Sequence, residues 1–131
     1  MPSTFKFSEK SFERMEGVDP RLKEIAKHAI MISKIDFGIP HDGGLRTAER
    51  QAELFADGKS KADGVNNKSR HQSGMALDVY AYVDGKASWE TEHLALVATA
   101  MLQSASILGY KLEWGGNWRS FVDMPHFQIH G

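Results

Sequence analysis

The stretch from Ser69 to Asp78 reads Ser-Arg-His-Gln-Ser-Gly-Met-Ala-Leu-Asp and is the most informative part of the sequence. Its first half is polar and leads into Gly74, a residue that permits a sharp or positive-φ turn. From Met75 to Val83 apolar and polar residues alternate, which predicts a strand. The expected core face comprises Leu77, Val79, Ala81 and Val83. Because Asp78 then points away from the core, the turn can bring its carboxylate together with the imidazole of His71.

The third candidate ligand lies near the C-terminus, in the segment Asp-Met-Pro-His-Phe-Gln that runs from residue 123 to residue 128. Its His126, together with His71 and Asp78, would complete a set of two histidines and one carboxylate, which with water is common in catalytic zinc sites. Asp123 precedes His126 by three residues and could take a proton from the attacking water and pass it to the leaving amine. The sequence therefore predicts one Zn²⁺ ion with an acid/base carboxylate beside it.

The composition narrows the classes of partner and site. The chain has 131 residues, a net charge of -1 and no cysteine, which excludes disulfides and thiolate metal sites. Near-neutral charge gives no general electrostatic case for binding nucleic acid. No stretch approaches the roughly 20 apolar residues of a membrane span, and residues 1–10 lack the apolar region of a signal peptide. We expect a monomer that does not insert into membranes.

The flanking segments predict a single α+β domain over residues 1–131, with residues 1–10 as a weakly packed arm. Helices are expected from Asp19-Pro20 to about Ser33, from Thr47 to Phe55 or Ala56, and from Glu90 to Leu108. Short strands are expected at Ile35–Ile39, Tyr110–Trp114 and His126–His130, with a hairpin turn at Asp84-Gly85 and a long loop at Lys59–Arg70. These elements give a small, mostly antiparallel sheet packed with about three helices.

The pattern Ser69-x-His-x-x-Gly-x-Ala-x-Asp78, followed by Asp123-x-x-His126, resembles the D-Ala-D-Ala carboxypeptidase and dipeptidase metallopeptidases. These include phage endolysins that cleave the L-alanyl-D-glutamate bond of peptidoglycan stem peptides. The resemblance extends over most of the chain. Further matches are Phe5–Ser8 with a following helix, and Gly44–Thr47 with Gln51 beyond it. The endolysins that the chain most resembles have Asp at the acid/base position, as here, whereas the dipeptidases commonly have Glu.

This resemblance implies the fold of that family and roles for individual residues. The two histidines and Asp78 would bind zinc, and Asp123 would be the acid/base. Arg46 would stabilise the substrate carbonyl or the oxyanion. Some related endolysins carry a longer acidic loop that is linked to calcium control, but Gly116–Val122 is short and has no Asp or Glu. We therefore do not expect a calcium switch.

Several other residues have two open interpretations. Gln51 and Ser69 are expected at the substrate site or as hydrogen-bonding supports for neighbouring groups. Trp114 is expected to line the substrate cleft, and Trp118 with it, although core packing is an equal alternative for both. Gln128 could support a metal ligand or be an ordinary strand residue. His130 could be an accessory group or a frayed terminal residue.

Three functions are compatible with these features. The first is a phage-type endolysin, held in the host bacterial cytoplasm and reaching the wall in the periplasm through a pore made by a holin, as the resemblance implies. The second is a bacterial D-Ala-D-Ala dipeptidase or carboxypeptidase with the same metal site. The third is a non-catalytic zinc-binding or cell-wall-binding module. Retention of Asp123 and of all three candidate ligands favours an enzyme over the third possibility.

Overall fold

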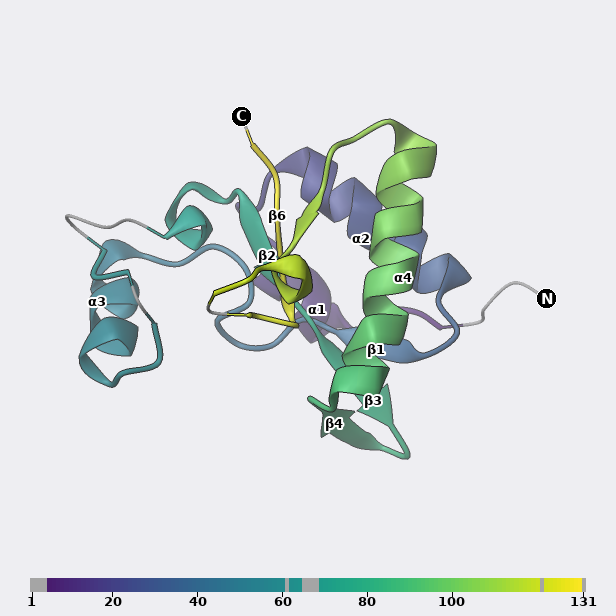
Figure 1. Ribbon diagram of the computed structural model, residues 1–131, viewed down its shortest axis with the longest axis horizontal. Coiled ribbons are helices and arrows are strands. Elements are labelled where there is room, and N and C mark those ends of the chain that lie inside the picture. Colours follow the sequence, from purple (N-terminus) through teal and green to yellow (C-terminus); the bar gives the residue numbers. More distant parts are fainter. Residues whose placement is uncertain (1–4, 61, 65–68, 121, 131) are drawn as a thin grey trace.

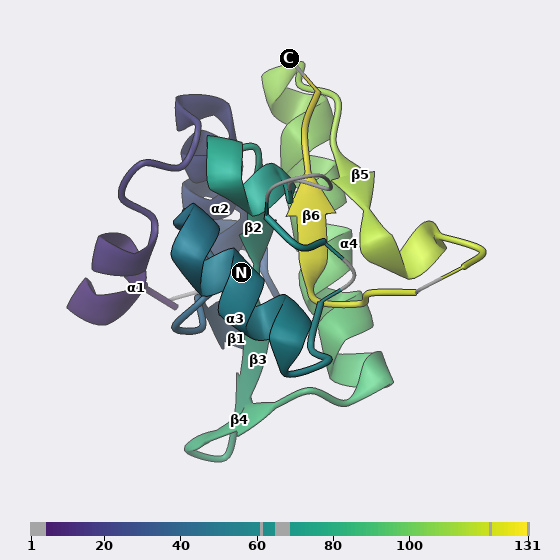
Figure 2. The same ribbon diagram turned by 90° about the vertical axis from the view of Figure 1, so that its left-hand side faces the viewer.

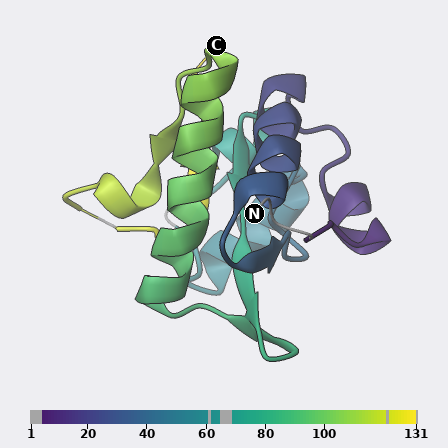
Figure 3. The same ribbon diagram turned by 90° about the vertical axis from the view of Figure 1, so that its right-hand side faces the viewer.

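The computed structural model describes residues 5–60, 62–64, 69–120 and 122–130. Helices α2 (Pro20–Ile32) and α4 (Thr91–Leu108) contact each other along one side of the molecule (Figure 3). Beside them lie two three-stranded antiparallel sheets, with strand orders β1-β3-β4 and β2-β6-β5 (Figure 1). The α+β class is confirmed, but two small sheets stand where one was expected. No helix in the described ranges has the length and apolar character needed to cross a membrane.

The strand predicted from Met75 to Val83 is divided between the two sheets. Its first part, β2 (Ala76–Asp78), pairs with β6 (His126–Gln128), and its second part, β3 (Tyr80–Val83), pairs with β1 (Asp36–Gly38). Between the two parts, the Val79 amide donates to the carbonyl of Pro125 at 2.9 Å. The predicted core face is buried at Leu77, Val79 and Ala81, whereas Val83 is half-exposed. The chain thus passes from one sheet to the other immediately after Asp78.

The three predicted helices form, and their caps explain where they begin. The Asp19 carboxylate accepts from the Arg21 amide at the start of α2, and Pro20 takes the first helical position. The Thr47 hydroxyl accepts from the Arg50 amide at the start of α3 (Ala48–Ala56). The remaining short elements are η1 (Arg70–Ser73), η2 (Gly115–Asn117), β4 (Lys86–Ser88) and β5 (Glu113–Trp114). The predicted turn between β3 and β4 has positive φ at both Asp84 and Gly85, as a tight hairpin requires.

The expectation of a weakly packed arm over residues 1–10 is wrong from Phe5 onward. Phe7 is 8% exposed and belongs to the hydrophobic core, where its ring meets the edge of Phe37 at a centroid distance of 5.2 Å. A further helix, α1 (Glu9–Arg14), follows at once and is capped by the hydroxyl of Ser8. The contact between Phe7 and Phe37 therefore ties this segment to the core. Residues 1–4 of the expected arm lie outside the described residues, as do residues 61 and 65–68 of the expected loop.

The two sheets and the segments around them set up one face of the molecule. Figure 2 looks onto β6, with α3 on one side of it and the segment carrying η2 on the other. The short helix η1 ends at Gly74, whose φ of +75° reverses the chain into β2. The Gly74 carbonyl accepts from the Asp19 amide at 2.8 Å, and a Cβ at Gly74 would come within 2.4 Å of the Gly17 carbonyl oxygen. The turn that the sequence predicted is thus fixed against the start of α2.

Candidate active site

His71, Asp78 and His126 converge although they come from three separate elements. His71 lies in η1, Asp78 ends β2, and His126 begins β6 as the direct partner of Asp78 across the ladder. Asp78 Oδ1 lies 3.1 Å from His126 Nδ1 and 3.3 Å from His71 Nε2. One potential ligand atom from each residue falls within 4.8 Å of the others. This is the convergence that the sequence predicted, and the group could hold a metal ion.

The two histidines present different ring nitrogens to this point. His71 donates its Nδ1–H to the carbonyl oxygen of Gly44 at 2.9 Å, which leaves Nε2 facing Asp78. His126 has its Nε2 2.8 Å from Oε1 of Gln128, which leaves Nδ1 facing Asp78. Metal-binding histidines commonly donate their other ring nitrogen to an oxygen in this way. The contact between His126 and Gln128 also favours one of the two interpretations of Gln128, namely that its side chain supports a candidate metal ligand.

The chemistry of the site fits a bound metal. His71 Nε2 is buried and has no hydrogen-bond partner within the described part of the chain, although Asp78 Oδ1 is close. A buried polar nitrogen without a partner is rare and calls for an explanation such as an ion. Burial alone would raise the pKa of Asp78, but the neighbouring His71 and His126 outweigh burial and hold that pKa well below its ordinary value. Two imidazole nitrogens and an ionised carboxylate are a donor set for a divalent transition metal.

Arg46 approaches the same centre and is held from three directions. Its Nη2 lies 3.2 Å from Asp78 Oδ2, its Nε donates to the Asp42 carbonyl at 2.8 Å, and its Nη1 donates to Gln51 Oε1 at 3.1 Å. Gln51 is fully buried, and its amide donates to Ser60 Oγ and to the Ala62 carbonyl. Gln51 therefore acts as a support for Arg46 rather than as an open surface for substrate.

Asp123 lies beside the three candidate ligands without joining them. Its Oδ2 is 3.9 Å from His126 Nδ1, and its side chain is 45% exposed. The backbone holds it in place, because the Asp123 amide donates to the Gly115 carbonyl at 3.0 Å. Burial, and after it the charge of Asp78, raise the pKa of Asp123. We refer to His71, Asp78 and His126 together as the metal group, because they could hold a metal ion. A half-exposed carboxylate with a raised pKa beside this group has the placement expected of a general base.

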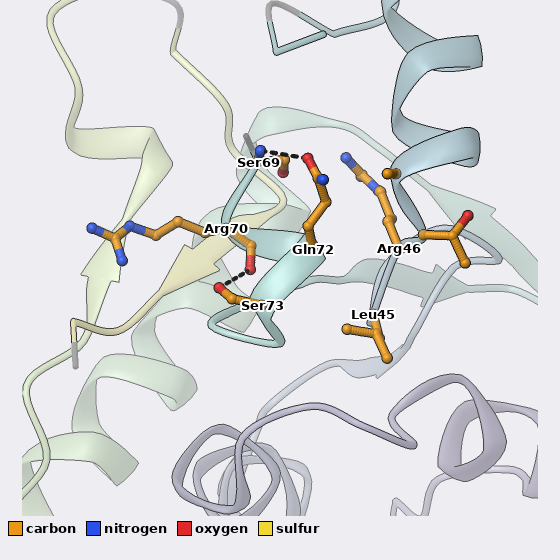
Figure 4. A pocket seen from close by; sticks show the side chains of 8 residues that line it. Leu45, Arg46, Ser69, Arg70, Gln72 and Ser73 are labelled. Atoms are coloured by element: carbon orange, nitrogen blue, oxygen red, sulfur yellow. Dashed lines mark hydrogen bonds between the residues drawn. The ribbon is translucent and has the colours of Figure 1, made fainter. Parts of the chain in front are cut away.

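The three candidate ligands, Arg46 and Asp123 line an open cleft of about 580 Å³. Ser69 and Trp118 also line this cleft. Ser69 caps η1, with its hydroxyl accepting from the His71 amide at 3.2 Å, so it positions a ligand while it borders the cleft. Arg46 and Ser69 are shared with a neighbouring cavity of about 740 Å³, which is lined also by Leu45, Gln72 and Ser73 (Figure 4). Arg46 therefore borders both cavities.

The family model described as phage L-alanyl-D-glutamate peptidase matches residues 3–128. The chain belongs to this family. It is 34% identical over 121 residues to the L-alanyl-D-glutamate peptidase of Escherichia phage T5, covering 92% of this chain and 86% of that protein. It is 29% identical over 97 residues to the peptidoglycan L-alanyl-D-glutamate endopeptidase CwlK of Bacillus subtilis, covering 66% of this chain and 57% of that protein.

A solved structure agrees with these matches. The chain resembles the Serratia marcescens L-Ala D-Glu endopeptidase ChiX with a TM-score of 0.83 and 35% identity, covering 95% of this chain and 90% of that one. Membership of the phage L-alanyl-D-glutamate peptidase family makes the chain a peptidase. The relatives include both phage and bacterial proteins.

Of the two interpretations of Trp114, the structure shows packing against the core and not a place at the substrate cleft. Trp114 is absent from the described lining of the cleft; its indole donates to the Met124 carbonyl at 2.7 Å, and its ring stacks on Phe127. The expected substrate contact is therefore corrected to core packing. Trp118 borders the cleft instead, with its ring centroid 5.2 Å from that of His126. Both tryptophans are half-buried and flank the same Gly-rich turn, Trp114 at the end of β5 and Trp118 directly after η2.

Two supporting groups could not be found from residue types. Gly44 orients His71 and Asp42 orients Arg46, but both do so through backbone carbonyls. A Cβ at Gly44 would lie 1.9 Å from the Arg14 carbonyl oxygen, so only glycine fits there. The sequence offered a signal only in the Gly43-Gly44 pair, which marks a close approach without naming its partner.

Proposed function

We propose that this protein is a zinc-dependent endopeptidase that hydrolyses the L-alanyl-D-glutamate bond of peptidoglycan stem peptides. The observation that carries the proposal is the group His71, Asp78 and His126, with the carboxylate of Asp123 3.9 Å from His126 Nδ1. The names of the phage T5, Bacillus and Serratia relatives all refer to this bond. A metal-binding triad with an adjacent carboxylate would supply the metal site and the general base that metal-dependent hydrolysis of a peptide bond requires.

Zinc fits the donor set better than the harder cations do. The chain has no cysteine, and the three ligands are two imidazoles and one carboxylate. Magnesium and calcium prefer oxygen ligands, whereas zinc accepts this mixed set and keeps a fourth position open in catalytic sites. When bound, zinc would supply a Lewis acid that lowers the pKa of a water molecule and polarises the scissile carbonyl.

The protein's own side chains then manage the proton and the developing charge. The half-exposed Asp123 carboxylate accepts a proton from the attacking water and returns it to the leaving amine. Arg46 uses three of the five N–H groups of a guanidinium for the described contacts, which leaves two for the substrate carbonyl oxygen. A fixed cation there stabilises negative charge that appears only in the transition state.

The setting that we propose is lysis of a host bacterium by a phage. The enzyme would act as a monomer, accumulate in the host cytoplasm and reach the wall in the periplasm through a holin pore. The likeness to the phage T5 peptidase over most of both chains favours this setting. Expression in a Gram-negative host is expected to leave cells intact until a holin is co-expressed, and sedimentation is expected to give the mass of one chain. Lysis without any pore-forming partner would contradict the holin requirement.

Digestion of purified muropeptides, followed by mass spectrometry, tests the reaction. The expected products are muramyl-L-alanine fragments and peptides with a new N-terminal D-glutamate, and they should be absent when a chelator is present. Asp123→Asn protein is the matched inactive control. Release of free D-alanine would instead favour a D-Ala-D-Ala dipeptidase or carboxypeptidase. Binding to peptidoglycan without any cleavage would favour a non-catalytic module.

A further inference from the structure

A chain of hydrogen bonds leads away from the metal group and returns to it. His126 Nε2 lies 2.8 Å from Gln128 Oε1, and Gln128 Nε2 donates to Glu113 Oε2 at 3.1 Å. Glu113 Oε1 lies 2.9 Å from His130 Nε2, and His130 Nδ1 lies 2.9 Å from Arg70 Nη2. Arg70 is the residue before His71, so the chain connects the segments that carry the two candidate histidine ligands.

The chemistry of Arg70 and Glu113 fixes the direction of every bond. Arginine can only donate, so His130 accepts at Nδ1 and must donate from Nε2 to Glu113. An ionised carboxylate can only accept, so the Gln128 amide must turn its NH₂ toward Glu113. The Gln128 oxygen then faces His126, which must donate from Nε2. The lone pair of His126 Nδ1 is left for the metal group.

Glu113 is the junction of this chain. It pairs with Gln128 across the β5–β6 ladder, so the backbone places the two side chains on one sheet face. Its Oε2 also accepts from the indole Nε1 of Trp118 at 2.7 Å, and Trp118 borders the cleft. One carboxylate therefore touches the support of a ligand, a wall of the cleft and the terminal His130.

Arg70 takes part in this network and also lines the neighbouring cavity. Figure 4 shows its guanidinium pointing away from Gln72 and Arg46, which also line the cavity. Besides its contact with His130, its Nη1 is 3.5 Å from the Ile129 carbonyl oxygen. The end of β6 is thus tied to η1 through side chains of residues 70 and 130.

We propose that Glu113 is a positioning residue of the metal centre. Through Gln128 it fixes the ring of His126 with Nδ1 toward Asp78, and through Trp118 it holds the cleft wall at the same time. His130 and Arg70 keep the Glu113 carboxylate in place, which gives His130 a structural task. The inference rests on the proposed metal site but does not depend on which peptide bond is cut.

Zinc affinity provides the first test, measured by competition with a chromophoric chelator on the full chain. Glu113→Ala should raise the zinc dissociation constant about tenfold, because removal of outer partners of metal ligands costs 10- to 100-fold. Glu113→Gln, which keeps an acceptor oxygen at the same reach, should lose less. Glu92→Ala, an exposed carboxylate in the first turn of α4, is the matched control and should not change affinity.

Imidazole NMR provides the second test and needs no activity. In ¹⁵N-labelled, zinc-loaded protein, the Nε2–H proton of His126 should exchange slowly with water. This proton should exchange at least tenfold faster in Glu113→Ala. Gln128→Met keeps the side-chain length, should show the same acceleration, and serves as the second variant if Glu113→Ala folds poorly.

Zinc affinity and proton exchange that match the unmodified protein in both variants would overturn the positioning role. A protein that binds zinc tightly, shows these differences and yet leaves muropeptides uncut would refute the proposed reaction alone. A protein that does not bind zinc at all would overturn both proposals.

Discussion

Asp78 and His126 are direct partners in the β2–β6 ladder, and their side chains meet with Oδ1 3.1 Å from Nδ1. The spacing of these two candidate ligands is therefore set by backbone pairing between two strands. His71 reaches them from η1, whose end is anchored through Gly74 to the start of α2. Two ligands thus sit on a rigid sheet and the third on a short, fastened turn, an arrangement that holds a site within narrow limits.

Zinc should stabilise the fold measurably. A ligand that binds only the folded state, present at 100 times its dissociation constant, adds about 2.7 kcal/mol to the free energy of unfolding. Urea denaturation with zinc and with a chelator measures this difference. His71→Ala should abolish it, whereas His41→Ala, which removes an exposed histidine outside the metal group, should preserve it. An equal response to zinc in His71→Ala would exclude this residue as a ligand.

Asp123→Asn should remove catalysis and keep the metal. Asparagine matches the shape but cannot accept the proton, and loss of a general base lowers kcat by about 10²- to 10⁴-fold. Zinc content after dialysis and kcat on a stem peptide measure the two effects separately. Asp84→Asn in the β3–β4 turn is the matched control, because asparagine is well suited to the positive φ found there. Turnover that survives intact in Asp123→Asn would remove Asp123 from the mechanism.

Arg46→Lys should lower kcat/KM by about 100-fold even though the charge is kept. A lysine ammonium cannot reach Asp42, Gln51 and Asp78 at once, so it would not present fixed donors to the substrate. Arg21→Lys, in a half-buried ion pair with Asp19 outside the cleft, should leave the rate unchanged. A rate within threefold of the unmodified enzyme would show that only positive charge matters at position 46.

Gln51→Met should destabilise the protein by about 1–3 kcal/mol, because it removes the hydrogen bonds of a buried amide and leaves its half-buried polar partners without them. The affected groups are Arg46 Nη1, Ser60 Oγ and the Ala62 carbonyl. Urea denaturation of metal-free protein gives the change in the free energy of unfolding. Gln103→Met, at an exposed position on α4, provides the comparison and should be close to neutral. Equal stability of the two variants would mean that water replaces the Gln51 amide.

The contribution of Asp42 to stability should depend on pH. Its hydrogen bonds to Arg50 lower the pKa of Asp42 against the opposing effect of burial. A carboxyl group with a lowered pKa in the folded state stabilises the fold above its unfolded pKa of about 3.9 and loses this effect as the pH falls through its folded pKa. Asp42→Asn should thus be less stable than the unmodified protein at pH 7, with the difference shrinking below about pH 4. Chelator-treated samples in urea at several pH values would measure it, and a constant difference would contradict the assignment.

Much of this fold was predictable because local signals and tertiary contacts agree. Asp19-Pro20 and Thr47 cap the helices they were expected to open, and Asp84-Gly85 makes the expected hairpin. The division of the Met75–Val83 strand could not be predicted, because alternation continues unbroken through residue 78 while the pairing partner changes. The packing of Phe7 was missed for a similar reason, since a short polar segment gives no sign that one aromatic ring reaches the core.

The candidate ligands were predictable from spacing, whereas their supports were not. His71, Asp78 and His126 stand in a pattern whose residue types already imply a metal. The carbonyls of Gly44 and Asp42 have no residue-type signature, since every residue carries one. Trp114 packs on Phe127 whereas Trp118 lies beside His126, and the sequence does not specify which of the two reaches the cleft.

The opposite ring nitrogens of the two histidines give them unequal reach from the backbone. Nδ1 is bonded directly to the Cγ atom, so the nitrogen that His126 turns toward Asp78 lies close to its own backbone. The Nε2 atom of His71 lies at the far edge of the ring and therefore farther from its backbone. An asparagine at position 126 and a glutamine at position 71 would each place a side-chain amide atom near the nitrogen that it replaces. A glutamine at position 126 and an asparagine at position 71 would not. Any effort to rebuild this centre for another metal must therefore choose side-chain length separately at each position.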